Sequence, residues 1–253
     1  MNIKAVVLAV LSLGSIGVAC AEEAKSDWTF TGNAGLFSDY RFRGFTQTNY
    51  RPAFQGGFDL AHSSGLYAGN WNSNVEQALY RGASLEMDFY GGYKYAVGDV
   101  NLDVGGIYYA YPSGNTASYG SDKQNHQTEL YFGASYGAFA AKFSYGLSNF
   151  FGAGDGTSVK TDGNYYVDLG YTQDLGNGLS VNAHYGYQYV KNGTDLGFVS
   201  NSVSDYRVGV TQDVKGWLVG ASLIGTSKKD FALTGSGKDA GKTSVVLSVT
   251  KGF

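Results

Sequence analysis

The chain has 253 residues and a formal net charge of -3 at pH 7. A nucleic-acid partner would require clustered lysine and arginine, which this charge and the absence of a basic tail argue against. Glycine occurs 38 times and tyrosine 21 times, whereas proline and methionine occur 2 times each and cysteine 1 time. This composition departs from that of an average soluble domain and favours closely packed strands over helices.

The first residues have the parts of a secretory signal peptide. A basic residue, Lys4, precedes an apolar run over residues 5–19, and small residues at 19–21 offer a cleavage site after Ala21. The run is shorter than the roughly 20 apolar residues that a membrane-spanning helix needs. We predict that residues 1–21 are removed on export and that residues 22–27 form a short periplasmic segment.

Cys20 lies inside this signal. Lipidation of Cys20 is the alternative to its removal, although Gly17 stands where a lipoprotein signal usually has leucine. If Cys20 is removed, the mature chain has neither a disulfide nor a thiolate metal site.

From Trp28 to Phe253, apolar side chains recur at every second residue, which is typical of β-strands. In residues 28–44, for example, Trp28 and Phe30 share a face with Leu36, and polar residues occupy the other face. Twelve segments follow this pattern: 28–44, 53–60, 66–72, 83–95, 100–111, 128–136, 139–148, 164–175, 179–190, 204–214, 217–226 and 243–253.

The charged residues of these segments fall on the polar face, with Lys251 as the exception. They are Asp39, Arg41, Arg43, Asp59, Glu86, Asp88, Lys94, Asp103, Glu129, Lys142, Asp168, Asp174, Asp205, Arg207 and Asp213. A soluble β-sandwich also alternates, but its exposed edges need protection. Aromatic residues near the segment ends instead favour a transmembrane barrel with lipid outside and a polar lumen.

The connections between segments support the same fold. Tight links such as AVGD (96–99) and GNG (176–178) alternate with long ones such as GTSKKDFALTGSGKDAGK (225–242). Outer-membrane barrels have short periplasmic turns and long extracellular loops. We predict an all-β, antiparallel up-and-down transmembrane barrel of about 12 strands over residues 28–253.

Residues 38–44, SDYRFRG, are interpreted as the end of the first strand. Ser38, Tyr40 and Phe42 then face outward, and Asp39, Arg41 and Arg43 face the lumen. Residues 204–209, SDYRVG, partly repeat the pattern, with Asp205 and Arg207 facing inward.

The stretch at 38–75, SDYRFRGFTQTNYRPAFQGGFDLAHSSGLYAGNWNSNV, together with LEMDFYGGYKY at 85–95, resembles the amino-terminal half of the TorF family, which are proteobacterial outer-membrane proteins assigned as porins. The resemblance implies a channel and brings neither a substrate nor a catalytic motif. It also implies that the barrel-assembly machinery reads the last strand, which ends on the aromatic residue Phe253.

Two motifs with enzymatic or nucleotide-binding spacing fail in their context. GASYG at 133–137 has the spacing of a serine-hydrolase elbow, but Ser135 lies in a strand that turns into another strand where a helix is needed. GKDAGKT at 237–243 has three residues between its glycines where a phosphate-binding loop has four.

No metal site or cofactor is predicted. His62, His126 and His184 fall in a turn, a loop and the wall, and no two of them have metal-ligand spacing. The loop acids could bind divalent cations, but solvated loop acids are the commoner case. They are Asp155, Asp162, Asp195 and Asp239.

These features predict a channel in the outer membrane of a Gram-negative bacterium, contacting lipid and passing small polar solutes rather than catalysing a reaction. Twelve strands leave a lumen narrower than that of a sixteen-stranded porin. Ten inward acids against five bases, in the set given above, predict a mild cation preference. The candidate selectivity residues are that set without Asp174 and Asp213.

Three points stay open at this stage. Inward tyrosines, namely Tyr90, Tyr109, Tyr111, Tyr131 and Tyr166, could stack sugars or fill space. A barrel-borne hydrolase would bring Ser135 and His184 together on the outer wall. A structural or adhesive barrel would have a closed lumen.

Overall fold

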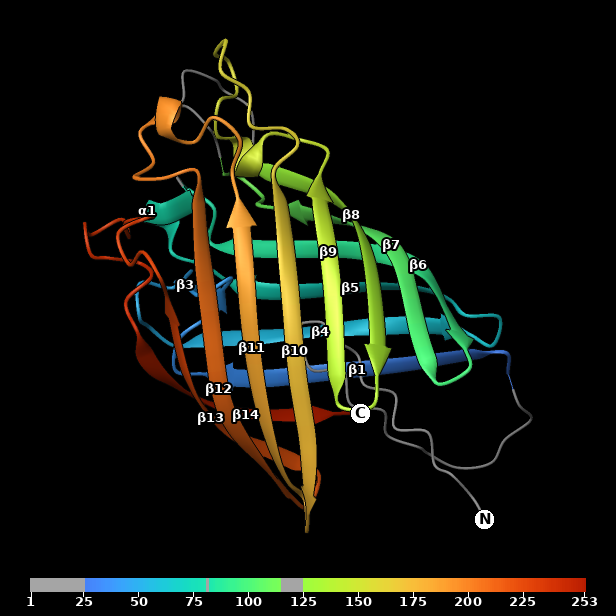
Figure 1. Ribbon diagram of the computed structural model, residues 1–253. Coiled ribbons are helices and arrows are strands. Elements are labelled where there is room, and N and C mark those ends of the chain that lie inside the picture. The colour runs from blue at the N-terminus through green and yellow to red at the C-terminus, as the bar shows by residue number, and fades with distance from the viewer. Residues whose placement is uncertain (1–25, 81, 115–124) are drawn as a thin grey trace.

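The computed structural model describes residues 26–80, 82–114 and 125–253, so the predicted signal peptide and Cys20 lie outside the described residues. Twelve antiparallel strands form a closed barrel, which confirms the predicted fold (Figure 1). They are β1 (Trp28–Phe37), β4 (Ala53–His62), β5 (Leu66–Asn74), β6 (Leu85–Val97), β7 (Val100–Ala110), β8 (His126–Tyr136), β9 (Phe139–Gly146), β10 (Tyr165–Gly176), β11 (Leu179–Tyr189), β12 (Ser202–Val214), β13 (Trp217–Thr226) and β14 (Ser244–Gly252).

The remaining elements are short. A small hairpin consists of β2 (Arg41–Phe42) and β3 (Phe45–Thr46), and the helical turns are α1 (Gln77–Tyr80), η2 (Phe150–Gly152) and η3 (Thr194–Leu196). No helix within the described residues is long and apolar enough to cross a membrane.

The barrel closes where its first and last strands meet. β14 pairs with β1 from Asn33↔Gly252 to Phe37↔Ser248. Beyond that ladder, the Gly32 and Phe253 backbones exchange two hydrogen bonds, of 2.7 and 2.9 Å. The Phe253 ring lies where a Cβ on residue 32 would be, so glycine at this position leaves room for it.

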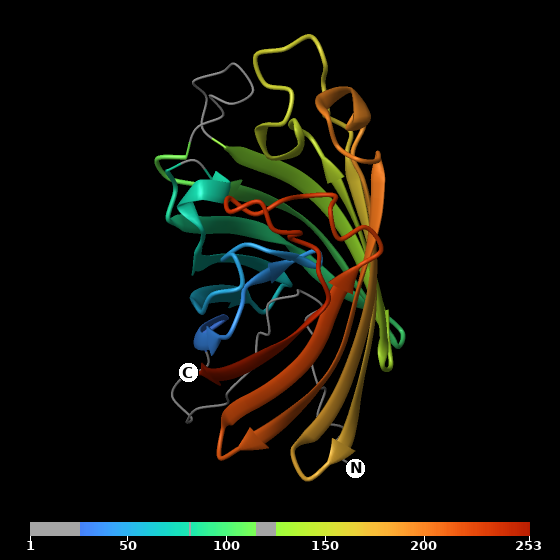
Figure 2. The same ribbon diagram turned by 90° about the vertical axis from the view of Figure 1, so that its left-hand side faces the viewer.

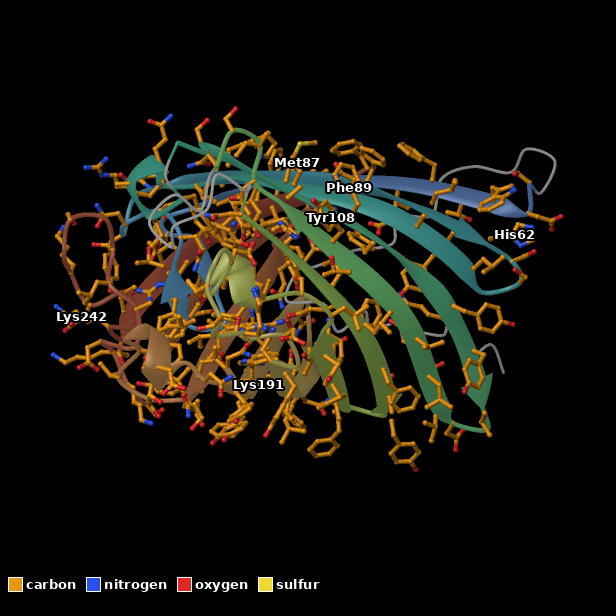
Figure 3. The ribbon with its side chains drawn as sticks, turned by 90° about the horizontal axis from the view of Figure 1, so that it is seen from above. His62, Met87, Phe89, Tyr108, Lys191 and Lys242 are labelled. Carbon is orange, nitrogen blue, oxygen red and sulfur yellow. The ribbon has the colours of Figure 1, made fainter. Side chains whose placement is uncertain are left out.

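The packing is inverted relative to a soluble protein, since charged residues are buried and large apolar ones are exposed. Glu86 and Glu129 are each 1% exposed, whereas Leu130, next in sequence, is 53% exposed. The exposed apolar set on the wall includes Phe30, Phe54, Phe89, Val104, Tyr108, Phe132, Phe143, Leu169, Val208, Leu223 and Leu247 (Figure 3). Such a surface suits lipid and not water.

Val208, which is 62% exposed in the middle of β12, tests whether the apolar outer face of the barrel contacts lipid. We expect Val208→Arg to lower the free energy of unfolding in lipid vesicles by roughly 2–4 kcal/mol, because the lipid face does not solvate a charge. Thr211→Arg, on the lumen face of the same strand, is the matched control. Equal losses in urea unfolding would contradict the assignment.

The two ends of the barrel differ. Short turns at 63–65, 98–99, 137–138, 177–178 and 215–216 define the turn end, as the sequence predicts. The opposite loop end has six longer links: L1 (38–52), L2 (75–84), L3 (111–125), L4 (147–164), L5 (190–201) and L6 (227–243). Lys242 in L6 and His62 beside a turn lie at these opposite ends (Figure 3).

Eleven predicted segments coincide with strands, apart from small differences at their ends, but the first was predicted too long. β1 ends at Phe37, and residues 38–44 leave the wall to enter L1. The outward position predicted for Tyr40 is therefore wrong: it is 5% exposed, packs against Trp71 and donates a 2.9 Å hydrogen bond to Glu86. The outward position predicted for Phe42 is wrong as well, because its ring packs inside the barrel against Tyr109. Polar and apolar residues still alternate in residues 38–44, but contacts with residues distant in the sequence determine the path of their backbone.

Candidate functional site

The site is the lumen, and the β2–β3 hairpin of L1 lies inside it. Asp39 organises the hairpin, since its carboxylate accepts hydrogen bonds from Thr46 and Thr48 and pairs with Arg41 at 2.5 Å. The chain reverses at Arg43 and Gly44, whose φ values are 47° and 83°. Glycine suits the second position because left-handed backbone costs it little.

Arg41 ties the hairpin to L6 at the loop end. Its guanidinium donates to the carbonyl oxygens of Gly44 at 2.8 Å and of Lys242 at 3.1 Å. The Thr46 amide also donates to the Ala240 carbonyl oxygen at 2.9 Å. These bonds hold L1 against the L6 backbone and leave Arg43 at the inner tip of the hairpin.

Arg43 crosses the lumen. Its guanidinium donates to both Glu129 oxygens on β8, at 2.7 and 2.8 Å. It also donates to Gln188 on β11 and lies 4.3 Å from the centre of the Tyr166 ring on β10. At least three strands separate β1 from β8 and from β11 in either direction around the barrel. In Figure 2 the teal strands of one wall stand opposite the orange strands of the other. The side chains of Arg43 and Glu129 are only 7% and 2% exposed.

The electrostatics of this contact keep the arginine charged. Burial alone would lower the pKa of Arg43, but the Glu129 carboxylate beside it outweighs burial and raises the pKa. One guanidinium nitrogen, Nη2, donates to both carboxylate oxygens, and hydrogen bonds between two charged groups are roughly twice as strong as those between neutral groups. The Arg43–Glu129 pair therefore fastens L1 to the far wall, and we call it the latch.

Two cavities meet at this hairpin. The turn-end cavity, of about 140 Å³, extends from the hairpin toward the turns and includes Lys142, His184 and Arg207 in its lining. The loop-end cavity, of about 350 Å³, lies among the loops. Phe42 and Arg43 line both cavities, so the tip of the hairpin separates them.

The β4–β7 wall carries acids whose neighbours are tyrosines. Asp59 accepts a hydrogen bond from Tyr90 at 2.7 Å, and Asp103 accepts one from Tyr67 at 2.7 Å. Asp88 is 2% exposed, and its Oδ1 has no hydrogen-bond partner among the described residues. With Glu86 bonded to Tyr40, this wall has more negative than positive charge.

The β10–β12 wall is held by a histidine between two acids. His184 bonds to Asp168 through Nδ1 and to Asp205 through Nε2, both at 2.8 Å, and Tyr166 donates to Asp205 at 2.9 Å. Because both ring nitrogens bond to carboxylates, His184 is bound as a bridge across three strands. Ser135 is not among its hydrogen-bond partners within the described residues.

The remaining predicted bases, Lys94, Lys142 and Arg207, form no ion pair within the described residues. Lys94 lies 4.6 Å from the centre of the Tyr67 ring and Lys142 lies 4.9 Å from that of Tyr131. Nε of Arg207 is buried without a hydrogen-bond partner among the described residues.

The structure thus places the predicted residues in three groups: the hairpin with Glu129, the acids of β4–β7, and the β9–β12 residues around His184. Sequence reasoning considered His184 as a metal ligand and as a catalytic base, and it did not identify Gln188 as a site residue. The lumen tyrosines are buried, and Tyr67, Tyr90 and Tyr166 donate to lumen acids. Among the loop acids, Asp239 pairs with Lys229 at 2.8 Å, and the described residues contain no group of three or more His, Cys, Asp or Glu that could hold a metal ion.

The chain thus forms a closed antiparallel barrel with an apolar exterior, a charged interior and an in-folded loop. The chain belongs to the family described as "Bacterial protein of unknown function (Gcw_chp)", which matches residues 21–253. No curated protein matches the chain.

Two solved porins have similar folds. The NanC porin in its rhombohedral crystal form has a TM-score of 0.57 at 8% identity, covering 88% of this chain and 98% of NanC. The KdgM porin in complex with disordered oligogalacturonate has a TM-score of 0.54 at 8% identity, covering 89% of this chain and 99% of KdgM. At these identities the likeness concerns the fold.

Proposed function

We propose that this protein is a channel in the outer membrane of a Gram-negative bacterium, through which small polar solutes diffuse. The observation that carries the proposal is the lumen itself: a closed wall surrounds charged side chains and two cavities that meet at one in-folded loop. The apolar exterior supports placement in lipid, with the turn end toward the periplasm. The porin folds of NanC and KdgM and the resemblance to the TorF family also support it.

The distribution of charge supports a mild cation preference. Arg43 neutralises Glu129, Arg41 neutralises Asp39, and His184 bridges two further acids. On the β4–β7 wall, by contrast, Asp59, Glu86 and Asp103 accept hydrogen bonds from tyrosine hydroxyls. None of these three acids forms an ion pair with a base of the described residues. Uncancelled acids along a narrow path favour cations over anions.

The proposal includes two further parts. Assembly uses recognition of the last strand by the barrel-assembly machinery, supported by the Phe253 ring being 71% exposed at the seam. No catalytic role is proposed, because the two ring nitrogens of the candidate base His184 are held by aspartates.

The direct test is current through the refolded protein in a planar bilayer under a salt gradient. We expect discrete conductance steps and a reversal potential with the sign of a cation-selective channel. A reversal potential of the opposite sign would overturn the proposed cation preference but not the proposal that the protein is a channel. A protein that is folded by circular dichroism and resists unfolding, but carries no current, would instead indicate a closed structural barrel.

Lys142 gives a specific test of the charge argument. We expect Lys142→Gln to move the reversal potential further toward the cation value, because it removes a positive charge from the turn-end cavity while Asp168 stays in place. Lys191→Gln, in L5, removes the same charge from a loop outside this cavity and is the matched control (Figure 3). Identical shifts in the two variants would show that the position of the charge is irrelevant.

A further inference from the structure

The loop-end cavity has a lining unlike the lumen below it. Six phenylalanines from four loops contribute to it: Phe42, Phe45, Phe150, Phe151, Phe198 and Phe231. Several of them are in ring contact, with 5.2 Å between the centres of Phe198 and Phe231 and 5.7 Å between those of Phe45 and Phe231. A passage for polar solutes gains nothing from such a lining, whereas an apolar molecule does.

The size of the cavity suits a small ligand. At about 350 Å³ it falls within the roughly 300–1,000 Å³ of ordinary ligand pockets, which are mostly apolar with a few polar groups. The kind of ligand that fits then depends on which polar groups of the lining are free to bind it.

Most polar side chains of the lining already have partners. Gln47 accepts from the Tyr80 hydroxyl, Gln188 accepts from Arg43 and donates to two carbonyl oxygens, and Thr46 donates to Asp39. Of the lining residues that the structure describes, Arg43 alone is charged, and its guanidinium is committed to the latch. A charged ligand would consequently find no free counter-charge here.

Asn125 is different. Its side chain lies in the cavity lining, the residue is 7% exposed, and its Oδ1 has no hydrogen-bond partner among the described residues. A buried acceptor without a partner costs free energy that a ligand donor can recover. One free acceptor can serve one hydroxyl or N–H donor, but it cannot satisfy the several hydroxyls of a sugar, each of which needs a partner when buried.

We propose that the loop-end cavity is a binding site for a small uncharged molecule with an aromatic or alicyclic ring and one hydrogen-bond donor. The ring lies among the phenylalanines, and the donor binds Oδ1 of Asn125. The proposal depends on the proposed channel only for the side of entry, since binding itself requires no conduction.

Phenol is the probe, and its saturable binding to the protein in lipid nanodiscs is measured by saturation-transfer NMR, with empty nanodiscs subtracted. We expect Phe198→Ala with Phe231→Ala to weaken phenol binding by about ten-fold, because ring contacts and apolar burial are lost. Phe132→Ala with Phe143→Ala, on the lipid-facing wall, removes the same two side chains and is expected to leave binding unchanged.

Asn125→Leu tests the hydrogen bond between the ligand's donor and Oδ1 of Asn125 without emptying the cavity. We expect it to weaken phenol about ten-fold and to leave toluene, which has the same ring but no donor, at least as tightly bound. Unchanged phenol binding in both variants, or equal displacement of phenol by glucose, would overturn the proposal. Conductance without saturable phenol binding rejects this site alone, and phenol binding without conductance rejects only the channel.

Discussion

Arg43→Ala is expected to raise the single-channel conductance markedly in bilayer recordings, because it removes the latch that holds L1 across the lumen. The change takes away both guanidinium–carboxylate contacts and leaves Glu129 without its counter-charge. Removing one partner of a buried ion pair typically costs about 3–5 kcal/mol. That penalty falls on the docked state of the hairpin and so favours its release.

The controls separate the latch from a simple loss of charge. Arg43→Lys keeps the positive charge but has one donor nitrogen where the guanidinium uses two, one on Glu129 and one on Gln188, so we expect an intermediate conductance. Glu129→Gln should act in the same direction as Arg43→Ala, and the double variant should add little to either single change. Strictly additive effects, or a conductance equal to that of the unmodified protein, would show that the hairpin does not limit the current.

Gly57→Ala is expected to destabilise the wall of the barrel strongly, because the added Cβ meets backbone atoms. A Cβ at this position of β4 would lie 2.2 Å from the carbonyl oxygen of Asn70 and 2.9 Å from the Cα of Trp71. Both atoms belong to the β5 backbone, so no side-chain rotation relieves the contact. Overpacking of this kind costs roughly 1–3 kcal/mol or more, and here it acts on a strand pair of the wall.

The measurement is urea-induced unfolding of the refolded barrel in lipid vesicles, followed by tryptophan fluorescence. Gly133→Ala is the matched control, because a Cβ there would lie 3.6 Å from its nearest neighbour, at an ordinary contact distance. The contact argument fails if the two variants unfold at the same urea concentration.

The strands, their faces and the alternation of turns and loops could be predicted because each is a local pattern. Period-two alternation assigns every second side chain to lipid, and the link lengths assign the ends. Residues 38–44 show the limit of this reasoning, since they alternate like a strand and yet leave the wall. The contacts that draw them inward involve Glu129, 86 residues away, and Lys242, 201 residues from Arg41.

The candidate site divides in the same way. Parity assigned Asp168, Asp205 and the other charges to the polar face, but their partners depend on the register between strands, which no local pattern determines. His184 shows the consequence: its residue type raised a catalytic hypothesis, whereas its neighbours across β10 and β12 make it a bridge. The reversal at Gly44, followed by the polar run TQTN at 46–49, is the one local signal that could have indicated a turn before the second wall strand.

The latch also has a consequence for the order of events during assembly. Its two ends are far apart in the chain, and the bond from Arg43 to Gln188 spans 145 residues. Contacts of such long sequence separation form late, because the intervening chain must be ordered first. L1 is synthesised before the other loops but can reach its final position only after β8 and β11 stand in the wall, so the lumen narrows late in assembly.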